Sequence, residues 1–120
     1  MSANDPLRTF IGELKPSPMN MLYPGQVWSL KGCSSRAAVH AIETLGNEDI
    51  VHVSILDSDG DVRVGHMPFA RLAFVNSADQ IVATVAPEDD FREGYAYWRA
   101  EFDKGAAGVY AIDVCEALDL

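Results

Sequence analysis

Three aspartates alternate along one short segment in a way that resembles the start of a calcium-binding loop. Asp57, Asp59 and Asp61 occupy every second position, as the first ligands of an EF-hand loop do. The glycine, however, stands at loop position 4 instead of 6, and Pro68 occupies position 12, where such a loop needs a bidentate glutamate. We therefore interpret 57–61 as a tight turn between two strands and predict no metal there.

The three histidines, His40, His52 and His66, are the next residues with ligand chemistry. They fall on separate predicted elements and lack the close spacing that makes a metal motif specific. The hairpin register predicted below places His40 and His52 on opposite faces, so we expect no shared metal ion and no cofactor. It also places His52 across from Glu43, as an exposed ion pair that contributes only ~0–1 kcal/mol.

His66 stands in Gly65-His66-Met67-Pro68-Phe69, at a predicted strand-to-helix junction where functional groups often sit on a rigid scaffold. With an acidic neighbour to orient it, His66 could act as a general base, with Arg71 or Tyr97 close by. The alternative is a histidine that only hydrogen-bonds its own loop. No nucleophile-elbow or phosphate-loop motif is present in the sequence, so we predict no catalytic residue and no enzyme.

The formal net charge of −9 restricts the class of partner. It opposes nucleic-acid binding, which depends on basic side chains that neutralise phosphates, and it disfavours anionic membranes. It favours a protein partner with a basic surface, because opposite charge steers association. Solubility alone is the alternative explanation. The predicted partner-binding residues are Glu88, Asp89, Asp90, Tyr97, Asp57, Asp59 and Asp61.

The clearest structural signal is an aromatic stripe, which we define as Phe91, Tyr95, Trp98 and Phe102. Its spacing places all four side chains on one face of an α-helix. Acidic residues before it and a glycine after it predict a helix over 90–104 whose stripe packs in the core. Gly94 inside this helix costs roughly 1 kcal/mol relative to alanine. Either another part of the chain approaches closely there, or the glycine is tolerated.

The other elements follow from apolar alternation and turn signals. A hairpin loop over 46–49 pairs Leu45 with Ile50. The aromatic stripe should cover the face of Val51, Val53 and Ile55 or pack near Trp28. We predict an α+β fold, with a small, bent, mainly antiparallel sheet or partly open barrel of about five strands, two main helices and a short C-terminal helix. The predicted strands are 27–30, 36–45, 50–56, 62–66 and 109–112. The predicted helices are 68–85, either continuous or as two pieces with the second capped by Ser77, then 90–104 and a piece capped by Asp113.

Length and composition fit one domain over 22–120, preceded by a flexible tail over 1–21. No apolar run approaches the ~20 residues of a membrane span, and the N-terminus has no secretory signal. Two cysteines, Cys33 and Cys115, do not indicate a disulfide framework. These observations predict a cytoplasmic protein.

Three phrases carry a resemblance that covers about residues 22–118. They are Ile50-Val51-His52-Val53-Ser54-Ile55, Gly65-His66-Met67-Pro68-Phe69, and Glu93-Gly94-Tyr95 with Trp98 and Gly105-Ala106-Ala107-Gly108-Val109-Tyr110. Together they resemble a group of small uncharacterised bacterial proteins. The resemblance implies a bacterial cytoplasmic domain and, by analogy, one of the compact acidic proteins that act as immunity or inhibitor proteins. It implies no catalytic residues.

Charge and the lack of a catalytic constellation therefore predict a protein-binding module that occludes a basic site on its partner. A small-ligand binder or enzyme that uses His66 and Arg71 is the first alternative. A homodimeric accessory domain is the second.

Overall fold

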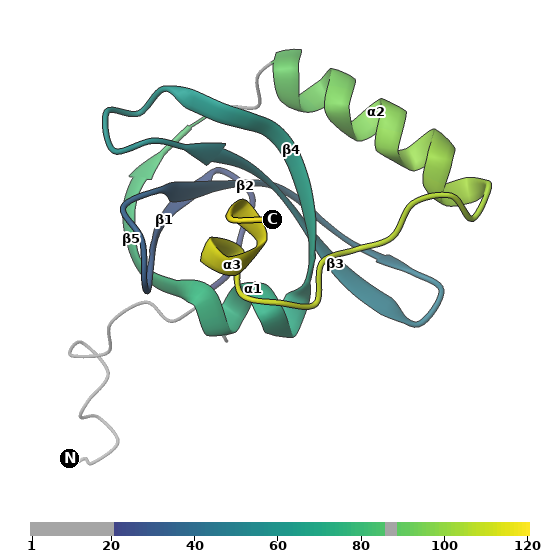
Figure 1. The fold of residues 1–120 in the computed structure, drawn as a ribbon, viewed down its shortest axis with the longest axis horizontal. Helices are drawn as coiled ribbons and strands as arrows, with labels where there is room; N and C mark the ends of the chain where they lie inside the picture. Colours follow the sequence, from purple (N-terminus) through teal and green to yellow (C-terminus); the bar gives the residue numbers. More distant parts are fainter. Residues whose placement is uncertain (1–20, 86–88) are drawn as a thin grey trace, which may run out of the picture.

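The computed structural model describes residues 21–85 and 89–120. Five strands form one antiparallel sheet in the order β4-β3-β2-β1-β5, and three helices accompany it, so the predicted α+β class is confirmed (Figure 1). The predicted tail lies outside the described residues except for Met21. The elements are β1 (Gln26–Leu30), β2 (Arg36–Leu45), β3 (Glu48–Leu56), β4 (Val62–Ala70), α1 (Arg71–Ser77), β5 (Ala78–Thr84), α2 (Asp89–Asp103) and α3 (Val114–Leu118).

The β2–β3 hairpin closes with a shorter turn than predicted. Leu45 pairs with Glu48 and Ile42 pairs with Val51, so the predicted pairing of Leu45 with Ile50 is wrong by two residues. Gly46 has φ of +63°, which supplies the backbone twist that a two-residue hairpin turn needs. A shift of two residues leaves each side chain near the turn on its predicted face.

A β-bulge at His40 changes the faces farther along β2. The register shifts between Val39 and Ala41, so Val39 and Ile42 both pack with the core although they are three positions apart. His40 turns toward α2, and its ring centroid lies 4.4 Å from that of Phe91. The prediction that His40 and His52 point to opposite faces is therefore wrong.

The concave side of the bent sheet holds the main core. Trp28, Phe69 and Phe74 are fully buried there with the inward side chains of β2 and β3. In Figure 1, α3 lies inside the curve of the sheet, next to α1. These two short helices cover the concave face of the sheet, where the aromatic stripe was predicted to pack.

The predicted helix over 68–85 is wrong in most of its length. β4 continues through Pro68 to Ala70, α1 is only seven residues long, and β5 follows it directly. Pro68 is compatible with a strand here because β4 is an edge strand, and its carbonyl accepts a hydrogen bond from the N–H of Tyr110 at 2.9 Å. The predicted last strand, 109–112, is reduced to one parallel bridge between Phe69 and Tyr110.

The aromatic helix is confirmed as α2, which begins at Asp89, so Asp90 lies in its first turn. Gly105, with φ of +77°, ends the helix, and the N–H of Ala106 donates to the Glu101 carbonyl at 2.8 Å. The predicted packing partner is wrong. α2 lies against the outer, convex face of β3 and β4, on the opposite side from the inward-facing Val51, Val53 and Ile55.

The C-terminal helix is capped as predicted, because the Asp113 carboxylate accepts a hydrogen bond from the N–H of Cys115 at 2.9 Å. The expectation of no disulfide is wrong, since Cys115 is bonded to Cys33 across 82 residues. The two cysteines meet because α3 folds back onto the turn between β1 and β2. Among the described residues, no helix is long and apolar enough to span a membrane.

Candidate functional site

Two histidines stand side by side on the outer face of the sheet. His52 comes from β3 and His66 from β4, and Nδ1 of His52 lies 2.9 Å from Nε2 of His66. The other nitrogen of His52, Nε2, lies 2.8 Å from the Glu43 carboxylate of β2. Three neighbouring strands thus supply a continuous chain of hydrogen bonds, Glu43–His52–His66.

The polarity of this chain follows from its acidic end. A carboxylate only accepts, so His52 donates from Nε2 to Glu43. Burial lowers the pKa of His52 and keeps it neutral at neutral pH, so its Nδ1 accepts. His66 therefore donates from Nε2, which leaves its Nδ1 as an unprotonated acceptor. No side chain or backbone group of the described residues donates a hydrogen bond to that atom.

The Glu43 carboxylate is held by α2 as well. The Tyr95 hydroxyl donates to it at 2.8 Å, and the Arg99 guanidinium approaches its other oxygen at 3.5 Å. Arg99 also donates to the Tyr95 hydroxyl at 3.2 Å. Burial raises the pKa of Tyr95, and the hydrogen bonds to Tyr95 and Asp103 raise the pKa of Arg99, so the first stays protonated and the second charged.

Three residues of the aromatic stripe, Phe91, Tyr95 and Trp98, lie against the two histidines. Ring centroids of Tyr95 and Trp98 both lie 4.9 Å from that of His52, in edge-on geometry. His52 has no exposed side-chain area, whereas His66 is partly exposed. Burial lowers the pKa of His66 to about 4, with the neighbouring His52 as a second cause, and burial also lowers the pKa of His52 itself. Both are neutral at neutral pH.

Two glycines allow α2 to come this close. A Cβ on Gly94 would lie 2.8 Å from the Cβ of His66, and a Cβ on Gly65 would lie 2.9 Å from the carbonyl oxygen of Asp90. The glycine inside the helix is therefore explained by close approach of β4, the first of the two readings of the sequence. His40 completes this layer, with a buried Nδ1 that has no partner among the described residues.

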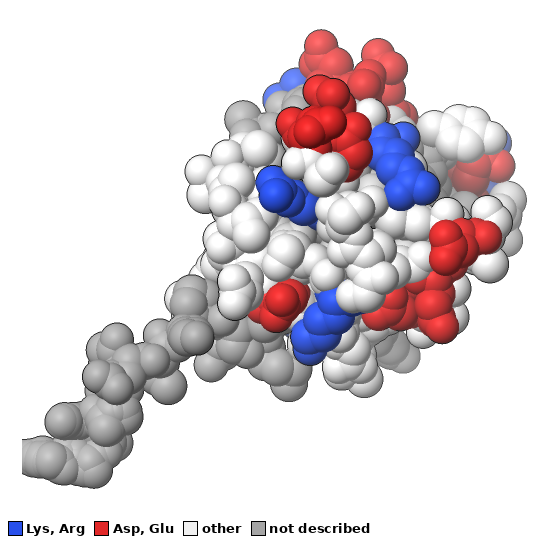
Figure 2. All heavy atoms as spheres, turned by 60° about the vertical axis from the view of Figure 1, so that its left-hand side comes forward, with Lys and Arg blue, Asp and Glu red and all other residues white. Residues whose placement is uncertain are grey.

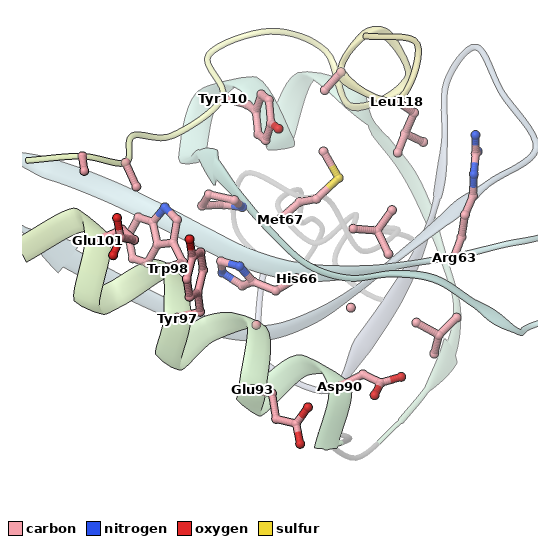
Figure 3. Close-up of a pocket in the computed structure, with 18 residues that line it drawn as sticks. Arg63, His66, Met67, Asp90, Glu93, Tyr97, Trp98, Glu101, Tyr110 and Leu118 are labelled. Atoms are coloured by element: carbon pink, nitrogen blue, oxygen red, sulfur yellow. The ribbon is translucent and has the colours of Figure 1, made fainter.

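A groove runs beside this polar layer. It has a volume of about 1020 Å³ and extends along β4 between α2 on one side and α3 with the 106–110 segment on the other (Figure 3). All seven residues from Val62 to Pro68 line it. Because side chains of a strand alternate between faces, a hollow lined by consecutive residues lies along the edge of the sheet. The other lining residues are Asp90, Glu93, Gly94, Tyr97, Trp98, Glu101, Ala106, Ala107, Tyr110, Ala117 and Leu118.

The floor of the groove is the outer edge of β4, which ends the sheet. Within the described residues, Tyr110 is the one residue that pairs with this edge: the Ala70 N–H donates to its carbonyl at 2.8 Å. Before Tyr110 the chain leaves the edge, because the indole N–H of Trp98 donates to the Gly108 carbonyl at 2.8 Å and holds that segment toward α2. The space between the diverging segment and β4 is the groove.

The structure brings some of the predicted site residues together. Asp90, Tyr97 and His66 all line the groove, and Tyr97 is 72% exposed. Asp89 is exposed at the start of α2 and pairs with Arg92 at 3.0 Å. Glu88 lies outside the described residues.

The remaining predicted residues lie elsewhere. Asp57, Asp59 and Asp61 form the turn that leads into the Val62 end of the groove. Arg71 lies apart from His66, in a separate hollow beside the β2–β3 turn.

Sequence reasoning missed the parts of the site that depend on long-range packing. Glu43 and His52 are bonded as expected, but His52 pairs with Ala41 across the strands and its side chain is fully buried. Glu101 was not singled out, although its spacing from Tyr97 and Glu93 places all three on one side of α2. No group of three histidine, cysteine or acidic residues in the described ranges 21–85 and 89–120 could hold a metal ion.

A scan against protein-family models, a search of curated proteins and a search of solved structures each give no match.

Proposed function

We propose that the protein is a protein-binding module that holds a basic segment of its partner in the groove along β4. One observation carries this proposal. The groove is lined by three carboxylates, from Asp90, Glu93 and Glu101, and by a single guanidinium, from Arg63. Arg63 already donates to the Ser35 hydroxyl at 3.0 Å. Lys104 pairs with the Glu101 carboxylate at 3.2 Å. A lysine or arginine side chain in the groove would therefore find acceptors in Asp90 and Glu93 and would compete with Lys104 for Glu101.

Tyr97 supplies an anchor on the α2 wall of the groove. It is a large aromatic side chain with 72% of its area exposed, between Glu93 and Glu101 on the same side of the helix. Tyrosine is enriched among the residues that dominate binding energy at interfaces, because it combines a large apolar surface with a polar hydroxyl. Covering Tyr97 would shield the neighbouring carboxylates and strengthen their attraction for a basic group.

The β3–β4 turn adds charge at one end of the groove. The Asp57 carboxylate accepts from the N–H groups of Asp59 and Asp61 at 2.9 and 3.0 Å, so it shapes the turn. The side chains of Asp59 and Asp61 are exposed. This side of the molecule comes forward in Figure 2, where acidic side chains form clusters at the top and toward the lower right and fewer basic side chains lie among them. Such a distribution favours steering of a basic partner.

An acidic module that covers a basic site on another protein blocks that site. This is the way in which an immunity-type or inhibitor protein acts, and we propose the same role here by analogy. A groove lined by carboxylates is unsuited to the phosphates of nucleic acids.

Affinity capture from a lysate of the cells that encode the protein tests the proposal. The bait is compared with a Glu93→Gln, Glu101→Gln double variant and with a matched control, Glu116→Gln, whose exposed carboxylate on α3 does not line the groove. We expect a partner that the bait and the control retain at low salt and that the double variant and 0.5 M salt release. Equal retention by all three baits, or no partner at all, contradicts the proposal.

The Glu43–His52–His66 chain favours a second candidate, a small-ligand binder in which His66 accepts a proton or hydrogen bond from the ligand. The unprotonated Nδ1 of His66 belongs to a residue that lines the groove, and His66 is bonded by a side chain and not by the backbone. A screen of small polar metabolites by NMR tests this candidate. A binder that loses affinity at least tenfold in His66→Asn supports it, whereas no shift of the His66 resonances contradicts it.

A homodimer is the third candidate, because the exposed edges of β4 in two copies could pair to form one continuous sheet. Light scattering would then give twice the chain mass. A single-chain mass at the working concentration excludes it.

A cytoplasmic location is proposed on the grounds given by the sequence, and the bond between Cys33 and Cys115 provides its test. In a reducing cytoplasm most such pairs are thiols, whereas oxidising compartments keep them bonded. Rapid alkylation in intact cells followed by mass spectrometry reports which form is present. Fully oxidised cysteines would contradict the cytoplasmic location.

A further inference from the structure

We infer that the partner segment binds as an extended strand that pairs its backbone with the outer edge of β4, and that it alternates basic and apolar residues. This inference rests on the proposed function and adds to it the binding mode and the residue pattern of the ligand. The binding mode and the residue pattern are both inferred from the position of the groove along the edge of the sheet.

The edge itself is available for pairing. β4 ends the sheet, and in the described part of the chain no residue pairs with its outer side between Val62 and Met67. An edge strand carries a row of backbone N–H and C=O groups that another strand can complete, which is the basis of strand addition in peptide recognition. The β3–β4 pairing shifts register between Val53 and Ile55 and again between Ile55 and Leu56, so β4 bends along this stretch. At ~3.3 Å per residue, the bent stretch offers a platform of at most roughly 20 Å.

One residue of the chain itself already pairs with this edge. Tyr110 pairs with it in parallel, through the N–H of Ala70 and the carbonyl of Pro68 at 2.8 and 2.9 Å. Pairing stops there because Trp98 binds the Gly108 carbonyl. A partner strand that fills the groove would continue, from Met67 to Val62, the pairing that Tyr110 begins.

The two walls of the groove differ in chemistry. The wall from α2 carries Asp90, Glu93 and Glu101, as Figure 3 shows, whereas the opposite wall presents Tyr110 and Leu118. Side chains of an added strand would point alternately to the two walls. Those that point to α2 meet carboxylates and should be lysine or arginine, and those that point to α3 should be apolar. An amphipathic helix would satisfy the walls but leave the edge of β4 unpaired.

The probe is a library of random twelve-residue peptides displayed on phage and selected on the oxidised, full-length protein. We expect enrichment of peptides in which basic and apolar residues alternate over about five positions. The double variant Glu93→Gln, Glu101→Gln should bind such a peptide at least tenfold more weakly, and Glu116→Gln should bind it as the unchanged protein does. A library that yields no groove-binding peptide, or only peptides without basic residues, overturns the inference.

A scan of backbone N-methyl groups along the selected peptide tests the pairing directly. Only every second N–H of an added strand points toward β4. N-methylation should therefore weaken binding at least about tenfold at alternate positions and less than about twofold at the positions between them, which serve as controls within the same peptide. A uniform loss, or a loss without this period, overturns strand addition. If such a peptide still depends on Glu93 and Glu101, the proposed function survives while the binding mode fails.

Discussion

Replacing Gly94 of α2 with alanine sets two effects of opposite sign against each other. Inside a helix, alanine is more favourable than glycine by about 1 kcal/mol, so a tolerated glycine would give a more stable protein when replaced. In the structure, however, the new Cβ would lie 2.8 Å from the Cβ of His66. Carbon atoms pack best at about 3.5–4.0 Å, so α2 or β4 must move.

The clash should exceed the gain in helix propensity. The Cβ of His66 is fixed by the backbone of β4 and cannot rotate away, as the end of a flexible side chain could. Insertion of a methyl group into a packed site of this kind costs about 1–3 kcal/mol. After subtraction of the helix gain, we expect the Gly94→Ala variant to be less stable by up to about 2 kcal/mol.

Urea unfolding of the oxidised protein measures this difference in the free energy of unfolding. Two control variants measure the steric effect and the helix-propensity effect separately. Gly65→Ala places its Cβ 2.9 Å from the Asp90 carbonyl oxygen and gains nothing from helix propensity, so it should cost about 1–3 kcal/mol. Ala96→Gly, at an exposed position of α2, should cost about 1 kcal/mol through propensity alone. A Gly94→Ala protein that is more stable than the original by about 1 kcal/mol would refute the described packing of α2 on β4.

Three further predictions concern the disulfide, the histidines and the carboxylate that joins them. Reduction of the Cys33–Cys115 bond, or the double replacement of both residues by serine, releases a constraint that spans 82 residues. The loop-entropy relation gives a loss of about 4.5 kcal/mol in the free energy of unfolding, measured in urea with and without reductant, and a loss under about 1 kcal/mol would contradict the bond. Since burial lowers the pKa of His66 from 6.5 to about 4, the stability from its neutral form is complete above pH 6.5 and is lost as the pH falls toward 4. Unfolding curves from pH 7.5 to 5 and an NMR titration of the imidazole check this, and a midpoint at 6.5 or above for His66 would contradict it. Glu43→Ala leaves buried donors of the site without an acceptor and should cost about 1–3 kcal/mol in urea unfolding, whereas Glu48→Ala, at an exposed position of the same hairpin, should cost under about 0.5 kcal/mol. Equal losses for the two glutamates would contradict the role of Glu43.

The elements with strong local signals could be predicted from the sequence. The spacing of the aromatic stripe and the glycine at its end gave α2 to within one residue, and Asp113 gave the cap of α3. The alternation of 36–45 and 50–56 gave β2 and most of β3. In each case the residues that predict the element are close in sequence to the element itself, within one or two helical turns or within one hairpin.

The failures came from features that depend on distant parts of the chain. Pro68 suggested a helix start, but an edge strand tolerates proline, and only the sheet order shows that β4 is at the edge. The β-bulge at His40 has no local signal, and it decides which histidines share a face with α2. The stripe was assigned to the wrong face because α1 and α3, both too short to be strong signals, fill the concave side.

The candidate site shows the same division. Asp90, Tyr97 and His66 were identified from charge, exposure and position, and all three line the groove. The groove itself arises where 106–109 diverges from β4, which is a property of the folded chain. Pro68 marks β4 as an edge strand only once 62–70 is known to be a strand, and the sequence was read as a helix from 68, so the platform of β4 was not predicted.

Hydrogen–deuterium exchange of the captured complex tests most directly whether the groove binds the partner. Amide exchange is compared between the free protein and the complex, segment by segment. We predict new protection within 62–68 on β4 and 90–101 on α2, and unchanged exchange at the β2–β3 turn. Protection confined to that turn and to α1, with the β4 edge unchanged, would contradict the account.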